Sequence, residues 1–388
     1  MKKLFFDIAI TGHHSEYIGH IINYLDNVKF ENNQFYFVVN PKFATTFPDI
    51  HYQASMIKNL KWIPISDYEL MKVEGSNGIW SSLMAMKILD NYSKKFEVDD
   101  VMVLDFHPIK YASIFYTPPY RMSSILFLLF HRLNKETWKQ KLEYFKRYYI
   151  TKWSSTNKQL NKIFILNDSD AVVFMNKEFE TNCFEMLPDP IPKLKPLEDF
   201  DIYNHYAINQ GRKIFLHIGA LGERKGTREV IEAAKYLSMA NQKKIAVLLV
   251  GKASNVEDEE LYLRLIAAIK KNTDVQIIWE NQFVPNQMMK SLFDQCDTVL
   301  LPYKNAEFSS GILGHAAAAN KRVIATNAGL IKKLVNTYQL GMLVDNPTAE
   351  ELADKISEII SIPPNRGGQT KFVEEHSPEV FAQTILGL

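Results

Sequence analysis

Short apolar segments with the length of buried strands alternate with helical patterns along this chain of 388 residues. The alternation constrains the fold strongly, because strands that are apolar on both faces need helices on both sides of a mostly parallel sheet. In the first half of the chain, helical patterns at 15–25 and 80–93 lie among these segments. We expect strands there at residues 4–10, 35–39, 101–105 and 171–174.

The alternation restarts after a proline-rich segment at residues 187–197. Pro188, Pro190, Pro192 and Pro196 stand in it, and each proline lacks an amide donor and disfavours a helical residue before it. We therefore predict two parallel α/β units, a first domain of residues 1–190 and a second of residues 191–370. The second domain is expected to hold strands at 213–218, 245–250, 276–279, 298–301, 323–326 and 342–344, and helices at 228–237, 259–271, 286–294 and 349–360.

Composition excludes several other classes of protein. A hydrophobic content of 46% is enough for two cores of ordinary size, and a formal net charge of +1 gives no reason to expect nucleic acid as a partner. Cys183 and Cys296 are too few for a disulfide framework and suit a reducing cytoplasm. Asp7 interrupts the first apolar run, which is therefore expected to be a strand rather than a signal peptide, and no stretch reaches the roughly 20 apolar residues that span a bilayer.

Residues 300–326 place a polar loop of small residues between a buried strand and an alanine-rich helix. Pro302 ends the strand, and Ser309, Ser310 and Gly311 precede a helix that is expected to begin at Ile312. Such a helix start offers hydroxyl groups, free N–H donors and the positive end of the helix dipole. The segment therefore predicts a site for an anion such as phosphate.

A second glycine-containing turn follows the predicted strand at 213–218. Gly219, Gly222 and Gly226 punctuate it, Arg224 and Lys225 stand in it, and a helix is expected directly afterwards. Strand, glycine turn and helix form the general arrangement that binds nucleotide phosphates. The turn fits neither the dinucleotide pattern G-x-G-x-x-G nor the P-loop pattern, so those two readings lose their support.

The spacing of these residues resembles the retaining GT-B glycosyltransferases of the glycogen-synthase-like superfamily known as family 4. That family has a glutamate, seven residues, a second glutamate, an alanine-rich helix and a G-x-P-V-I-A strand. Glu307 matches the first acid, His315 stands at the second, and Asn320 and Arg322 replace the glycine and the proline. The resemblance implies two Rossmann-like domains that face each other across a cleft, the first for the acceptor and the second for the nucleotide-sugar donor. A C-terminal helix at 378–386, within residues 371–388, would return to the first domain.

The resemblance also implies roles for residues of the second domain. The family's Arg and Lys hold the donor diphosphate; Lys225 matches the lysine, and because Ala220 replaces the arginine, Arg224 is expected to supply its charge from a neighbouring position. Glu307 would contact the sugar hydroxyls. His315 would either hydrogen-bond the ribose or be a satisfied histidine on a helix face. The remaining donor-binding candidates are Gly219, Ser309, Ser310, Gly311 and, where the family holds the base, Phe283 and Val284.

Candidates in the first domain follow two predicted strands. Gly12 and His14 lie in the turn after the first strand, where the family has a glycine-rich loop near the donor phosphates. Asp105 and His107 lie at a strand's carboxyl end, where open α/β sheets bind ligands. By resemblance His107 reaches the donor sugar or the leaving phosphate, although an Asp–His pair could instead lock a loop. By the same resemblance, His131 stands where the family has a further histidine at the end of a strand.

No metal or other cofactor is expected. Asp168, Ser169 and Asp170 spell the D-x-D motif that GT-A glycosyltransferases use to bind divalent metal. That motif follows a strand in GT-A enzymes, whereas here we expect it to lead directly into the strand at 171–174. The ten histidines form no H-x-x-x-H or H-E-x-x-H pattern.

A basic segment with interleaved aromatic residues spans positions 132–162. It holds nine Lys or Arg residues against Glu136 and Glu143, together with Trp138, Tyr144, Phe145, Tyr148, Tyr149 and Trp153. A helix of this composition can lie on an anionic membrane surface, or it can be an ordinary solvated helix whose rings cover the core. Both readings stay open from the sequence alone.

Together these features predict an enzyme that transfers a hexosyl unit from a nucleoside diphosphate sugar, with UDP as the first guess, to a hydroxyl of a saccharide or lipid-linked glycan. The family implies retention of configuration without a metal, in polysaccharide or glycoconjugate biosynthesis, in the cytoplasm or at the inner face of the membrane. Three alternatives remain: a GT-B nucleotide-sugar epimerase, a non-catalytic nucleotide-sugar-binding partner, and an NAD-dependent oxidoreductase, which lacks its glycine fingerprint.

Overall fold

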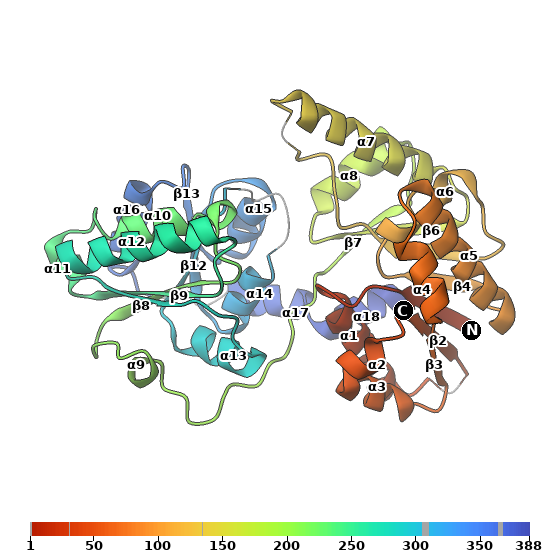
Figure 1. The fold of residues 1–388 in the computed structure, drawn as a ribbon, viewed down its shortest axis with the longest axis horizontal. Helices are drawn as coiled ribbons and strands as arrows, with labels where there is room; N and C mark the ends of the chain where they lie inside the picture. Colours follow the sequence, from red (N-terminus) through yellow and green to blue (C-terminus); the bar gives the residue numbers. More distant parts are fainter. Residues whose placement is uncertain (1, 31, 134, 305–309, 364–367) are drawn as a thin grey trace. The chain divides into compact units, whose positions relative to one another are not determined.

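The computed structural model describes residues 2–30, 32–133, 135–304, 310–363 and 368–388 (Figure 1). The chain divides into two compact units. Unit 1 comprises Met1–Pro190 and Ser377–Leu388, and unit 2 comprises Ile191–His376. The division between Pro190 and Ile191 falls inside the proline-rich segment, and the chain re-enters unit 1 at Ser377.

Unit 1 is built on a parallel sheet of seven strands in the order β3-β2-β1-β4-β5-β6-β7. The chain winds outward from β1 to β3 and then returns to the other side of β1 with β4, so the winding direction reverses between β1 and β4. At such a switch point the loops after both strands open onto the same edge, where α/β proteins bind ligands. The strands are Lys2–Asp7, Gln34–Val39, Leu60–Pro64, Asp100–Val103, Arg121–Ile125, Leu160–Leu166 and Phe184–Leu187, numbered β1 to β7.

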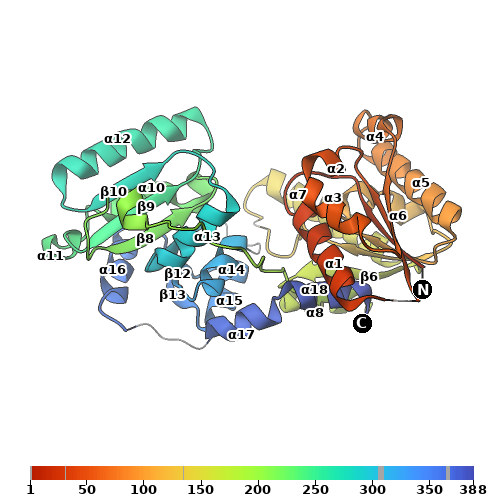
Figure 2. The same ribbon diagram turned by 90° about the horizontal axis from the view of Figure 1, so that it is seen from below.

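Helices cover both faces of this sheet (Figures 1 and 2). On one face the core contains side chains of α1 (His14–Val28), α2 (Phe43–Thr46), α3 (Pro48–Ser55) and α18 (Pro378–Leu386). The other face is covered by α4 (Asp67–Glu74), α5 (Ile79–Phe96), α6 (Ala112–Phe115), α7 (Trp138–Ser155) and α8 (Ser169–Glu178), with the short helix η1 (His107–Ile109) after β4.

The last helix is attached to the first strand of the chain. Lys3 is buried and donates from Nζ to the carbonyl oxygen of Ile385 at 2.8 Å, while Asp100 lies 3.1 Å from the same ammonium. A cation at this position also opposes the negative end of the α18 dipole. The ring of Phe381 packs 4.8 Å from that of Tyr17 on α1. The C-terminal helix is therefore part of the core of unit 1.

Unit 2 repeats this design with a parallel six-stranded sheet in the order β10-β9-β8-β11-β12-β13. Its switch point lies between β8 and β11, the strands that precede the two predicted anion-binding turns. The strands are Lys213–Ile218, Ile245–Val250, Gln276–Glu280, Thr298–Leu301, Arg322–Thr326 and Gly341–Val344, numbered β8 to β13.

The sheet of unit 2 is likewise covered on both faces (Figure 2). One face packs against α10 (Thr227–Ala233), α12 (Val256–Asn272) and α16 (Ala349–Ile359). The other packs against α9 (Ile202–His205), α13 (Asn286–Gln295), α14 (Gly311–Ala318), α15 (Gly329–Tyr338) and α17 (Gly368–Glu375). Two short helices, η2 (Glu223–Lys225) and α11 (Met239–Gln242), stand in connecting segments.

One predicted strand is wrong. Residues 171–174 lie in helix α8, and Asp168 caps that helix by accepting a hydrogen bond from the Ala171 amide at 3.2 Å. Four consecutive apolar residues fit a strand or one turn of a helix equally well, and the capping aspartate decides for the helix. The sequence analysis also missed strands β3, β5, β6 and β7. No helix in the described part of the chain has the length and apolar character needed to cross a membrane.

Candidate functional site

The glycine turn after β8 surrounds a buried lysine. Lys225 is 8% exposed and donates from Nζ to the carbonyl oxygen of Ile218 at 3.3 Å. Burial, followed by the nearby charge of Arg224, lowers the pKa of Lys225 to about 8. Gly219 has φ 122°, and a Cβ there would collide with the Lys225 ammonium. The absence of a side chain at Gly219 therefore makes room for the Lys225 side chain. The turn holds the lysine ammonium in a partly desolvated position, where a phosphate can bind beside it.

Gly226 brings this turn against the segment that follows β11. Its φ is 70°, and a Cβ there would collide with the carbonyl oxygen of Pro302. The Lys304 amide donates to the carbonyl oxygen of Arg224 at 2.9 Å, which fixes the same two segments to each other. The two predicted phosphate-binding turns are thus adjacent within unit 2.

A buried histidine that the sequence analysis missed connects the elements that carry these two turns. The ring of His217, in β8, is fully buried, with Nδ1 3.0 Å from the Leu300 carbonyl oxygen and Nε2 3.0 Å from Thr227 Oγ1. Thr227 Oγ1 also accepts from the Gly222 amide at 3.1 Å. Burial lowers the pKa of His217 to about 4, so the ring is neutral near pH 7 and links β8, β11 and the start of α10. The sequence did contain a signal for His217, namely a polar residue inside an otherwise apolar strand.

Tyr303 connects the cationic turn with the start of α14. Its buried ring has Lys225 Nζ 5.2 Å and the Arg224 guanidinium carbon 6.0 Å from the centroid. The Tyr303 hydroxyl lies 3.4 Å from Ser310 Oγ. Ser310 is the N-cap residue of α14 but makes no side-chain capping bond, and a Cβ at Gly311 would meet no described residue within 4 Å. Two cations and a helix N-terminus thus stand together, an arrangement that favours an anion.

The remaining residues of unit 2 that were predicted to bind the donor differ in how far they are buried. His315 lies on α14, half-buried, with its ring stacked 5.4 Å from that of Phe293. Phe283 is 65% exposed, whereas Val284 packs partly buried against the core. Glu307 and Ser309 lie outside the described residues. The roles expected for these residues stay predictions.

Two departures from the family signature have a structural explanation. Asn320, where the family has glycine, adopts φ 56° after the end of α14, and asparagine tolerates this left-handed conformation better than most residues. Arg322, where the family has proline, donates from Nη2 to the Ile359 carbonyl oxygen at 3.0 Å, at the end of α16. Neither replacement disturbs the strand β12 that follows.

In unit 1 the turn after β1 holds an ion pair. His14 Nδ1 lies 2.8 Å from Asp7 Oδ2 at the start of α1. Burial acts to lower the pKa of His14, but the hydrogen bond and charge of Asp7, with the charge of Asp105, together raise it. Gly12 has φ 72° and is exposed, as a tight turn before a helix requires. His14 is therefore a cation-forming group at the switch point of the first sheet.

The turn after β4 faces the same cavity, which has a volume of about 360 Å³. Its wall includes His14, Asp105, His107 and Lys110. Asp105 accepts a hydrogen bond from the backbone amide of His107 at 2.9 Å. The carboxylate therefore binds the backbone of the loop and not the imidazole ring of His107. Burial and then the charge of Lys110 lower the pKa of His107. The cavity brings together His14 and His107, two of the predicted residues, within unit 1.

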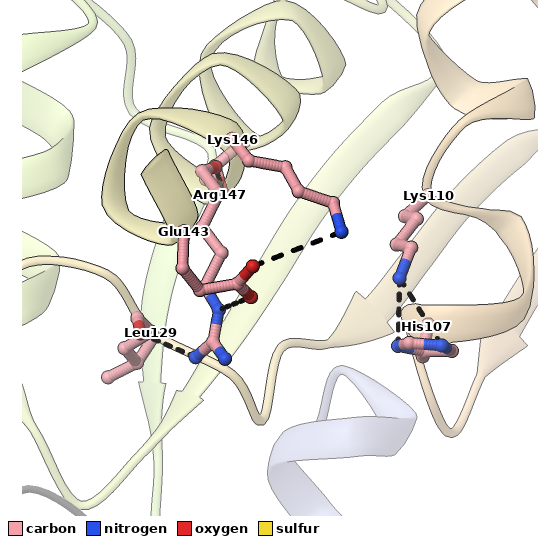
Figure 3. Close-up of polar contacts among 7 residues, drawn as sticks. His107, Lys110, Leu129, Glu143, Lys146 and Arg147 are labelled. Carbon is pink, nitrogen blue, oxygen red and sulfur yellow. Dashed lines mark hydrogen bonds and ion pairs between the residues drawn. The ribbon is translucent and has the colours of Figure 1, made fainter. Parts of the chain in front are cut away.

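The opposite wall of this cavity comes from α7, which the sequence analysis did not connect with the site. Glu143, Lys146, Arg147, Ile150 and Thr151 line it at the spacing of one helix face. Figure 3 shows the side chain of Lys146 extending from α7 toward the opposite wall, where the side chain of Lys110 points at the ring of His107. Nothing local in the sequence indicates which face of α7 packs there.

His131 and Asp168 belong to a separate buried cluster of unit 1. Asp168 is fully buried, accepts from Nε and Nη2 of Arg132 at 2.9 Å each, and has His131 Nε2 at 3.4 Å. Although burial acts against it, these partners hold the pKa of Asp168 well below its usual range. Asp168 thus serves as a helix cap and ion-pair partner. The part of the chain that the structure describes contains no group of three His, Cys, Asp or Glu residues suited to a metal ion.

Two parallel α/β units, each with its loops gathered at a switch point, define the GT-B fold of glycosyltransferases. The glycosyltransferase from Rickettsia africae ESF-5 has this fold, with a TM-score of 0.71 at 16% identity over 100% of this chain and 97% of that chain. HepE of Anabaena in complex with UDP gives 0.68 at 13% identity over 100% and 99%. WaaG, a glycosyltransferase involved in lipopolysaccharide biosynthesis, gives 0.61 at 13% identity over 100% of both chains.

The sequence of unit 2 also matches a known protein family. Residues 199–374, fewer than half of the chain, match the family model of the glycosyl transferases group 1. This match and the fold together support a hexosyltransferase enzyme. No curated protein sequence matches the chain.

Proposed function

We propose that the protein transfers a hexosyl unit from a nucleoside diphosphate sugar to a hydroxyl group of a saccharide or lipid-linked glycan, in polysaccharide or glycoconjugate biosynthesis. The observation that carries the proposal is the buried, partly desolvated ammonium of Lys225 beside Arg224 and the start of α14. UDP is the proposed nucleotide, because structures of the similar HepE of Anabaena contain UDP and UDP-glucose.

The mechanism rests on charge stabilisation. Negative charge builds on the diphosphate as the glycosidic bond breaks, and fixed cations and N–H donors that face it lower the barrier, each by about 3 kcal/mol. Lys225, Arg224, Ser310 and Gly311 supply these groups in unit 2. Transfer with retention of configuration and without a metal is part of the proposal. Glu307 stays the residue predicted for the sugar hydroxyls, and His107 the residue predicted from unit 1.

Replacement of Lys225 tests the donor site. Lys225→Ala should lower the turnover of UDP-glucose, or of whichever UDP-hexose is accepted, by about tenfold or more, the loss expected when one charge-stabilising donor is removed. Lys235→Ala is the matched control, because Lys235 is exposed in the same part of unit 2 and pairs with Glu232 at 3.2 Å. Turnover of Lys225→Ala at the level of this control would remove the assignment.

The products distinguish the alternative functions. Release of an epimerised free sugar without any acceptor would favour the epimerase. UDP-sugar binding without hydrolysis or transfer would favour a non-catalytic partner, and an absorbance change that depends on nicotinamide cofactor would favour the oxidoreductase.

We also propose that α7 places the protein at an anionic membrane surface in the cytoplasm. Exposed apolar side chains repeat along one side of this helix at intervals of three or four residues, among exposed lysines. The exposed fractions are 70% for Trp138, 60% for Leu142, 51% for Phe145, 44% for Tyr149 and 50% for Trp153.

Vesicle binding tests this second proposal. The purified protein should sediment with vesicles that contain anionic lipid at low salt, and less with neutral vesicles. The double variant Trp138→Ser/Phe145→Ser should lose most of this binding. Trp80→Ser is the control, since Trp80 is 68% exposed but stands on α5. Equal sedimentation of the double variant and the wild type would exclude α7 as the contact.

A further inference from the structure

The cavity of unit 1 has an excess of positive charge near Lys110. Among the described residues no carboxylate lies within ion-pair distance of this lysine; its polar contacts are with the ring of His107, where Nζ lies 3.1 Å from Nδ1 and 3.2 Å from Nε2. A neutral imidazole offers one acceptor nitrogen and a charged one offers none. The ammonium is thus held against a ring that can stabilise it only weakly.

The two carboxylates of the cavity wall are occupied elsewhere. Glu143 accepts from Arg147 Nε at 2.7 Å and lies 3.9 Å from Lys146 Nζ, and Asp105 accepts from the backbone of its own loop. Arg147 is further engaged with the carbonyl oxygen of Leu129 at 3.2 Å (Figure 3). The ammonium ions of Lys110 and Lys146 therefore keep donor capacity for a ligand, since Lys110 contacts only an imidazole ring and Lys146 lies beyond hydrogen-bond distance from Glu143.

The charges of the two walls act on each other. Burial and then the charge of Lys146 lower the pKa of Lys110, and burial and then Lys110 lower that of His107. Lysine ammonium groups bind phosphate as point charges, and the Arg147 guanidinium, whose fork also suits phosphate, is already engaged with Glu143 and the Leu129 carbonyl oxygen. An anion placed between the two lysines would relieve their repulsion.

We propose that the cavity between η1 and α7 binds a phosphate group carried by the acceptor of the transfer reaction. This inference rests on the proposed function, in which unit 2 holds the donor and the acceptor hydroxyl comes to unit 1. The volume of about 360 Å³ exceeds what one phosphate fills, and Leu126, Phe127 and Ile150 add apolar wall for the group attached to it. Two acceptor types carry such a phosphate, a soluble sugar phosphate and a lipid-linked glycosyl diphosphate.

The test uses His107 as a reporter inside the cavity. Inorganic phosphate should bind the full-length protein and raise the pKa of His107, which is followed by the NMR shift of its ring protons over a pH titration. Octyl phosphate distinguishes the two acceptor types: binding about tenfold tighter than that of inorganic phosphate indicates a lipid-linked acceptor, and equal binding a soluble one. Absence of any shift of His107 with both probes would overturn the inference.

Matched variants separate this site from general attraction to a basic surface. Lys110→Gln/Lys146→Gln should weaken phosphate binding by about tenfold or more, because two charge-assisted hydrogen bonds are lost. Lys139→Gln/Lys141→Gln removes the same charge from exposed positions of α7 and should bind as the wild type. Glu143→Gln removes a competing carboxylate and should tighten binding. Equal weakening by both lysine pairs, or no gain from Glu143→Gln, would refute the site.

Measurement of UDP binding distinguishes a failure of the acceptor phosphate site from a failure of the proposed transferase function. It is measured by calorimetry on the same samples and also shows that each variant is folded. Retained UDP binding without a phosphate response of His107 would refute the acceptor site alone. Failure of the wild type to bind UDP would refute the proposed function itself.

Discussion

Replacement of Lys225 by methionine should stabilise the ligand-free protein while it weakens donor binding. The lysine is buried in the glycine turn of unit 2, and the only hydrogen bond of its ammonium among the described residues is to the Ile218 carbonyl oxygen. A methionine of similar length fills the same space without a charge. The expected gain in the free energy of unfolding measures how strongly the buried charge of Lys225 destabilises the ligand-free fold.

The magnitude follows from the pKa of Lys225. A pKa lowered from 10.5 to about 8 corresponds to about 3 kcal/mol of unfavourable free energy for the charged form, at about 1.4 kcal/mol for each pH unit. Between pH 8 and 10.5 the unfolded chain binds more protons than the folded one, so stability rises with pH in this window. The penalty is fully present below pH 8. At pH 7 Lys225→Met should therefore be more stable by about 1–3 kcal/mol, since the methionine also loses the hydrogen bond.

Hydrogen exchange measured on peptides of β8 and β9 reports the stability of unit 2 separately from that of unit 1. Measurements from pH 7 to 10 should show the advantage of Lys225→Met shrinking as pH rises. Calorimetry at pH 7 should show UDP affinity reduced by about tenfold or more, because a charge-assisted hydrogen bond to the diphosphate is lost.

Two results would refute this reasoning. One is a variant that exchanges faster than the wild type at pH 7, which would mean that the ammonium stabilises the empty turn. The other is unchanged UDP affinity, which would place the diphosphate away from the lysine. Lys235→Met serves as the control for a simple change of surface charge.

Three further predictions concern single residues. Gly226→Ala should lower the free energy of unfolding of unit 2 by at least about 2 kcal/mol, because its positive φ and the Pro302 carbonyl oxygen both oppose a side chain; denaturant titration measures this. Asp7→Asn should lower the pKa of His14 in an NMR titration, since burial then acts without the compensating carboxylate, and an unchanged pKa would contradict the ion pair. Asp168→Asn should lower the unfolding free energy of unit 1 by about 3 kcal/mol, because it leaves a guanidinium without its buried partner; a melting temperature equal to the wild type's would refute this.

The fold of unit 2 was largely readable from the sequence because its strands are uninterrupted apolar runs. Ile245–Val250 is buried at all six positions, and its bounds match the prediction. Unit 1 was harder to read, since β5 carries Ser123 and Ser124 in the middle of the strand, both buried. Ser124 donates to the carbonyl oxygen of Val103 at 2.9 Å. This long-range bond satisfies the buried hydroxyl group, so the serine fits a core strand although its polarity did not suggest one.

The candidate sites divide in the same way. Lys225 and its turn were found because glycine spacing and strand–helix order are local signals. The contribution of α7 to the unit 1 cavity was not found, since Lys110 and Lys146 are 36 positions apart and only packing brings them together. The helical period shows which residues share a face, but it does not show which face the rest of the protein covers.

The attachment of α18 to β1 has a consequence for the order of events during synthesis. Lys3 and its carbonyl partner at Ile385 are 382 positions apart, so Lys3 is synthesised long before Ile385. Unit 2 lies between them in the sequence, so it can complete its own sheet on the nascent chain while unit 1 still lacks the helix that covers Tyr17. The fold of unit 1 can therefore be completed only after the whole of unit 2 has been synthesised.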